Sequence, residues 1–196
     1  MAEQATTART TARAGERTAA RPRGREAREL AAAIVRDAGG EIVGRTRVQK
    51  IGYLLELAGL GSGFRYAYKH YGPYSDDLTQ AMRSADVFGL VEEEERVSDW
   101  GGLYSIFRLT VPAHPDPARN RFVQAAARTS PIELELAATA AYLHVARGYP
   151  DPWAETRRRK PQKAADGRLA KAKRAYERLR AIKTPIALPD IPGTRP

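Results

Sequence analysis

The sequence contains no cysteine and no apolar run as long as a membrane-spanning helix. The first absence excludes disulfide bonds and thiolate metal ligands, and is usual in a reducing compartment. The longest apolar runs fall well short of the roughly eighteen residues that a membrane span needs. The first thirty residues also lack the apolar core of a signal peptide. We therefore expect a cytoplasmic protein with no membrane partner.

Catalytic patterns are equally scarce. The three histidines, His70, His114 and His144, lie in three different predicted elements, and none forms a metal-binding spacing with another histidine or with carboxylates. The glycine-rich stretch 59–63 follows a predicted helix instead of preceding one, so no helix N-terminus would face a phosphate there. We expect no catalytic residue, no metal site and no cofactor, and hence a protein that is not an enzyme.

Charge is present but unevenly distributed. The net charge of +10 divides into +3 for residues 1–30, −1 for residues 31–150 and +8 for residues 151–196. Residues 1–23 have almost no large apolar side chain, which predicts a disordered basic arm. Residues 184–196 contain four prolines and predict an extended tail. A single domain is expected between them, over residues 24–183.

Periodicity and capping residues predict mainly α-structure with minor β-structure. Residues 47–58 have apolar side chains at helical spacing, with Gln49 and Lys50 on the polar side. The aromatic-rich run 64–71 reads as a strand that Gly72 and Pro73 end. A hairpin is expected around residues 98–102, in the position of the wing of a winged-helix domain. Further helices are predicted over residues 25–38, 76–88, 118–128, 131–146, 151–159 and 166–182.

Three segments resemble a known family. They are the heptapeptide Val48 to Leu54 (VQKIGYL), the pentapeptide Tyr71 to Ser75 (YGPYS) and the pair Lys160-Pro161. These segments resemble the bacterial Panacea-type antitoxin domain and related winged-helix-like proteins, over about residues 29–183. The sequence differs from that pattern in beginning the first motif with valine and in having Tyr68 where tryptophan is common. The resemblance implies a non-catalytic antitoxin or adaptor that binds another protein, such as a toxin.

Two sets of residues are candidates for binding. A turn with two tyrosines is suited to a protein partner, because each ring is rigid while its hydroxyl stays in water. We therefore predict that Tyr71, Gly72, Pro73 and Tyr74 form a structured surface turn that contacts the partner. The alternative partner is DNA, which a basic C-terminal region would contact through its phosphates. The residues of this second set are Arg157, Arg158, Arg159, Lys160, Arg168, Lys171 and Arg174.

The predicted wing argues against the usual winged-helix contact with DNA. Glu92 to Glu95 are four consecutive carboxylates, and the helix before them, over residues 76–88, has a net charge of −2. Both surfaces repel a polyanion. The alternative explanation of the four glutamates is that they protect an exposed strand edge from pairing. The sequence predicts neither the oligomeric state nor the identity of the partner.

Overall fold

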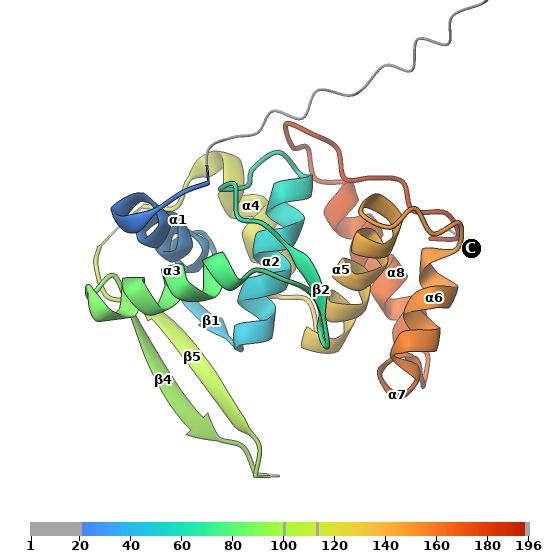
Figure 1. Ribbon diagram of the computed structural model, residues 1–196, viewed down its shortest axis with the longest axis horizontal. Coiled ribbons are helices and arrows are strands. Elements are labelled where there is room, and N and C mark those ends of the chain that lie inside the picture. The colour runs from blue at the N-terminus through green and yellow to red at the C-terminus, as the bar shows by residue number, and fades with distance from the viewer. Residues whose placement is uncertain (1–20, 100, 113, 195–196) are drawn as a thin grey trace, which may run out of the picture.

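The computed structural model describes residues 21–99, 101–112 and 114–194 and is mainly helical, with small antiparallel sheets (Figure 1). Most of the predicted basic arm therefore lies outside the described residues. The first half of the fold alternates helices with short strands. Its elements are α1 (Gly24–Asp37), β1 (Glu41–Val43), α2 (Arg45–Leu57), β2 (Ala67–Lys69), β3 (Gly72–Tyr74), α3 (Asp76–Val87), β4 (Val91–Val97) and β5 (Leu103–Leu109).

Within the described residues, the second half contains helices and no strand. Its helices are α4 (Pro117–Ala127), α5 (Pro131–Val145), α6 (Pro152–Arg159), α7 (Pro161–Ala164) and α8 (Arg168–Arg180). Four of them begin with proline, whose missing N–H and fixed φ suit the first helical turn. All the predicted helices are present, with ends that differ by one or two residues. None of the helices described here is long and apolar enough to cross a membrane.

The larger sheet has three antiparallel strands in the order β1-β5-β4. Strand β5 lies in the middle, with Val43 paired to Ile106 on one side and Glu94 paired to the same residue on the other. The β4–β5 hairpin was predicted, and it projects away from the helices below α3 (Figure 1). Strand β1 was not predicted, because three residues are too few to show alternation.

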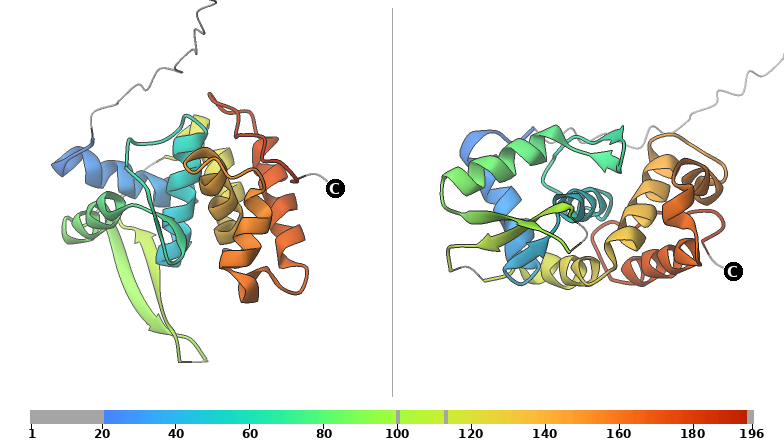
Figure 2. Two further views of the ribbon diagram at one scale, coloured as in Figure 1. Left: turned by 45° about the vertical axis from the view of Figure 1, so that its right-hand side comes forward. Right: turned by 90° about the horizontal axis from the view of Figure 1, so that it is seen from below.

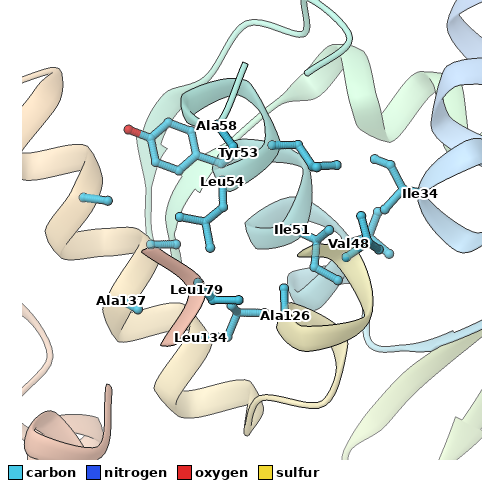
Figure 3. Packing of buried hydrophobic residues seen from close by; sticks show 14 of the residues in the cluster. Ile34, Val48, Ile51, Tyr53, Leu54, Ala58, Ala126, Leu134, Ala137 and Leu179 are labelled. Atoms are coloured by element: carbon cyan, nitrogen blue, oxygen red, sulfur yellow. The ribbon is translucent and has the colours of Figure 1, made fainter. Parts of the chain in front are cut away.

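The central helix of the first half is α2. Val48, Ile51 and Leu54 are at most 2% exposed and pack against α4, α5 and the end of α8 (Figure 3). The prediction that Gln49 and Lys50 lie on a solvated side was wrong, since both are buried, at 4% and 1% exposure. Interior polar groups need hydrogen-bond partners, and both residues have them, as described below.

The aromatic segment also differs from its prediction. Instead of one strand over residues 64–71, it forms the two-stranded hairpin β2–β3, in which Lys69 pairs with Gly72. Gly72 and Pro73 therefore begin a strand and do not end one. Gly72 has a φ of +88°, and a Cβ atom at this position would collide with the Thr139 hydroxyl on α5. Only glycine combines this backbone conformation with such a close approach.

Helix α5 connects the two halves of the molecule. It packs on α2 and β3 on one side and on α6 and α8 on the other (Figure 2). Every residue from Leu134 to Leu143 is buried. The apolar spacing of residues 131–146 also predicts that Val145 faces inward, but it is 50% exposed at the end of the helix. A helix buried over its whole circumference makes one continuous core across both halves.

The segment after α8 has no regular secondary structure up to residue 194, yet it is anchored. Leu188 and Ile191 are 2% and 1% exposed. The Ile186 N–H donates to the Ala58 carbonyl at the end of α2, over 3.1 Å. The Trp153 indole N–H donates to the Thr194 hydroxyl over 2.8 Å. Up to residue 194, the predicted tail is thus packed along the body of the protein.

A further predicted core residue is at the surface. The apolar spacing of residues 76–88 predicts a buried face that includes Phe88, but this residue, which follows α3, is 61% exposed. The Arg28 guanidinium lies 3.8 Å from the centre of its ring. The other predicted core residues of this helix, Leu78, Ala81, Met82 and Ala85, are buried.

Candidate partner-binding site

The three segments that carry the family resemblance meet at the β2–β3 turn. From α2, the Lys50 ammonium donates to the Pro73 carbonyl over 2.7 Å. The Gln49 side-chain amide accepts from the Ser75 N–H over 2.7 Å and donates to the Ser75 carbonyl over 3.0 Å. From the junction of α6 and α7, the Lys160 ammonium donates to the His70 carbonyl over 2.9 Å. Residues more than 100 positions apart in the sequence therefore hold one turn in place.

A buried carboxylate balances these lysines. Glu135 of α5 is 4% exposed and accepts from Lys160 at 2.8 Å and from Lys163 at 2.6 Å. Burial lowers the pKa of Lys50 to about 7, and the charges of Lys160 and Lys163 act in the same direction, while Glu135 opposes them. The charge of Lys50 is thus disfavoured, because a desolvated ammonium is costly.

The predicted contact residues separate into two kinds. Gly72 and Pro73 are buried, which corrects the expectation that the whole turn lies at the surface. Tyr71 is 51% exposed, with Lys163 Nζ 4.7 Å from the centre of its ring. Tyr74 is half-buried, and its phenol oxygen accepts from the Thr79 hydroxyl over 2.7 Å. Tyr71 is therefore the residue of this turn that offers most surface to a partner.

A groove of about 520 Å³ opens beside the turn. Its walls are the N-terminal part of α2, helix α3, the β4–β5 hairpin and the two tyrosines of the turn. Its lining is a mixture of apolar, aromatic and charged side chains. They include Arg45, Met82, Arg83, Glu93, Glu95, Leu103, Tyr104 and Phe107.

Sequence reasoning did not find this groove. It treated Glu92 to Glu95 as one solvated set, whereas alternation along β4 places Glu93 and Glu95 on the face toward the groove. The side chain of Glu93 is only 14% exposed, and Arg45 bonds to both groove-facing carboxylates, at 2.6 and 2.7 Å. The period-two pattern of the strand was the available signal. The opposing walls depend on long-range packing that the pattern does not specify.

The predicted phosphate-binding residues are only partly available. Lys160 is buried in the Glu135 network, so its assignment to a phosphate-binding surface was wrong. Arg158 and Arg159 both bond to Glu155, and these hydrogen bonds lower the pKa of that carboxyl to about 2. Arg168 is half-buried, and its guanidinium lies 3.4 Å from Asp166. The remaining members of the predicted set, Arg157, Lys171 and Arg174, are exposed.

No metal site was predicted, and the described residues contain no group of three or more histidine, aspartate or glutamate side chains suited to hold a metal ion. Comparison with protein-family models and with curated proteins finds no match to this chain.

Proposed function

We propose that this chain is a non-catalytic regulatory protein of the Panacea-type antitoxin or adaptor kind, and that it works by binding a partner protein. We also assign residues 24–109 to a winged-helix-like domain. This assignment is supported by the order helix, strand, helix, helix, strand, strand, with a small hairpin inserted before α3. Helices α4 to α8 are additions to that domain.

One observation carries the functional proposal. The three resembling segments converge on a single turn, although they lie in α2, in β3 and between α6 and α7. Three buried polar side chains hold this turn, and burying each of them costs desolvation free energy. These side chains are Gln49, Lys50 and Lys160. The fixed turn presents Tyr71 at the mouth of a groove. A rigid aromatic residue beside a groove is an effective anchor for a protein partner, because little conformational entropy is lost on binding.

Site-specific photo-crosslinking tests this proposal. A photoreactive phenylalanine replaces Tyr71 in the intact protein, expressed in the cells from which the gene comes. The matched control carries the same group at Ala170, an exposed position on α8. We expect one protein to be crosslinked from position 71 and not from position 170. The purified partner should bind Tyr71→Ala at least about tenfold more weakly than wild type, without a change in melting temperature.

If the partner is a toxin, the same experiment has a second expected outcome. The protein captured at position 71 should arrest growth when it is expressed alone, and co-expression of this chain should restore growth. The proposal is rejected if no protein is crosslinked, or if both positions capture the same proteins equally.

The second candidate function, DNA binding, is favoured by one feature of α8. Lys171, Arg174 and Arg178 are exposed at spacings of three and four residues, which places them in one row. Titration with duplex DNA at several salt concentrations tests this row. Replacing all three residues with alanine should weaken binding and reduce its salt dependence, whereas replacing Glu92 with glutamine should not weaken it. Retention of full affinity by the triple variant would reject this row as the DNA contact.

A further inference from the structure

The groove has a graded wall on the side of the hairpin. Cross-strand pairs place Glu93 beside Phe107, Glu95 beside Ser105 and Val97 beside Leu103, all on one face. Phe107 is buried at the base, whereas Val97 and Leu103 are 67% and 72% exposed at the tip. The wall therefore runs from an apolar floor through two carboxylates to an exposed apolar pair.

The carboxylates in this wall are incompletely neutralised. Glu93 and Glu95 share one guanidinium, that of Arg45, whose side chain is 61% exposed. The Arg45–Glu95 pair, in which both side chains are more than half exposed, is weak and readily exchanged for another cation. The segment that contains α3 and β4, residues 76–97, has the same sign, with seven carboxylates and two arginines, although Glu92 and Glu94 lie on the other face of the hairpin. This segment is acidic in a protein whose net charge is +10.

The opposite wall adds apolar contact. Tyr71 stands half-exposed at the mouth, and Met82 of α3 lines the interior. Arg83 is the other exposed cation of the lining, on the α3 side. An occupant that reaches both walls would thus meet carboxylates on the hairpin and apolar side chains at each end.

We propose that this groove binds an extended segment of the partner protein in which a lysine or arginine lies between apolar residues. The cation would take the place of Arg45 on Glu93 and Glu95, and the apolar side chains would contact Leu103 at one end and Tyr71 at the other. The hairpin wall from residue 93 to residue 97 is about 13 Å long, the length of four or five extended residues. This assignment rests on the proposed function and adds the chemistry of the partner to it.

Short synthetic peptides provide the probe. A fluorescein-labelled peptide of alternating leucine and arginine is titrated with the full-length protein, and binding is measured by fluorescence anisotropy. One control peptide has glutamate in place of arginine, and the other has serine in place of leucine. We expect both controls to bind at least about tenfold more weakly, because one loses the charge complement and the other loses the apolar contacts.

Strand alternation supplies a matched pair of protein variants. Glu93→Gln combined with Glu95→Gln removes two charges from the groove face, whereas Glu92→Gln combined with Glu94→Gln removes two from the opposite face. We expect the first variant to bind the leucine-arginine peptide at least about tenfold more weakly and the second to remain within about twofold of wild type. Leu103→Ser should also weaken binding. Thermal melts verify that each variant is folded.

Two results would overturn the assignment. These are an equal loss in both double variants, and equal binding of the serine-arginine or leucine-glutamate peptide. The crosslinking experiment separates the two proposals. If position 71 captures a partner while peptide binding does not depend on Glu93 and Glu95, the groove assignment alone is rejected. If both experiments fail, the protein-binding function is rejected with it.

Discussion

Lys50 is a buried cation that donates a hydrogen bond to the backbone of β3, although burial disfavours its charge. Its ammonium donates to the buried Pro73 carbonyl in β3, and a buried carbonyl is costly without a donor. Two further lysines, Lys160 and Lys163, lie close enough to disfavour its charge, and Glu135 only partly compensates. The hydrogen bond from Lys50 thus fixes the turn, although burial disfavours the charged form of this lysine.

This equilibrium predicts a pH dependence. Burial lowers the pKa of Lys50 from 10.5 to about 7, so between these values the unfolded chain holds a proton that the folded chain does not. The contribution of Lys50 to stability should therefore rise with pH across that window and be constant below it. Relative to Lys50→Met, the free energy of unfolding of the wild type should increase by up to about 1.4 kcal/mol per pH unit.

Urea unfolding at pH 6, 7.5 and 9 measures this difference. Burial raises the pKa values of Tyr53, Tyr66 and Tyr176, which should reduce stability with increasing pH only near and above the ordinary tyrosine value of about 10. Measurements up to pH 9 avoid that opposing effect. Parallel stability curves for the two proteins would show that Lys50 does not titrate in this range.

At the scale of elements, α2 packs against helices of both halves of the core. Leu54 is 0% exposed and lies among side chains of α5, α8 and α2 itself (Figure 3). Truncating Leu54 to alanine leaves a cavity that the surrounding helices fill only partly. The dependence of two halves on one helix makes such a cavity costly.

Leu54→Ala should lower the free energy of unfolding by about 2 to 5 kcal/mol. Leu57→Ala is a matched control, because Leu57 lies in the same helix but is only half-buried. The control should lose clearly less, as measured by urea unfolding followed by circular dichroism. Equal losses would mean that burial in this helix does not determine the cost.

The sequence predicted the helices because their signals are local. Ser75 caps α3 by accepting from the Leu78 N–H, and Asp151 caps α6 by accepting from the Ala154 N–H. Apolar spacing then located most of the buried side chains. The β2–β3 hairpin was missed because its strands have three residues each, and because Gly72-Pro73 usually ends a strand.

The site was less accessible to sequence reasoning. Polarity placed Gln49 and Lys50 outside, since a periodic pattern does not reveal which polar groups find partners on distant segments. Lys160 was assigned to a phosphate-binding surface for the same reason, although its partners Glu135 and His70 lie 25 and 90 positions away. Tyr71 could be predicted as an exposed residue of the turn, and it is 51% exposed. Its groove could not, because it forms only when α2, α3 and the hairpin come together.

At the scale of the molecule, charge and packing divide the protein differently. The chain is acidic over α3 and β4, in the first half, and basic over residues 151–196, in the second half. Packing unites them, because α5 is buried between the two halves. A shared core of this kind favours a single cooperative unfolding transition over independent melting of two domains.

Tryptophan fluorescence can test this cooperativity. The chain has two tryptophans, so Trp100→Phe leaves Trp153, which is 1% exposed in the C-terminal half, as the single reporter. The urea midpoint from Trp153 fluorescence should coincide with that from far-ultraviolet circular dichroism, which reports all helices. An earlier fluorescence midpoint would show that α6 and α8 detach before the first half unfolds.

The burial of residues 134–143 of α5 on all sides also has a consequence during synthesis. The ribosome produces α5 after α2 and β3, which cover one side of it, but before α6 and α8, which cover the other. While residues 146–180 are being added, the nascent chain therefore presents an alanine- and leucine-rich surface to solvent. Exposed apolar surface of this kind favours aggregation and chaperone binding. The interval between translating α5 and translating α8 is the period in which this protein is most vulnerable to misfolding.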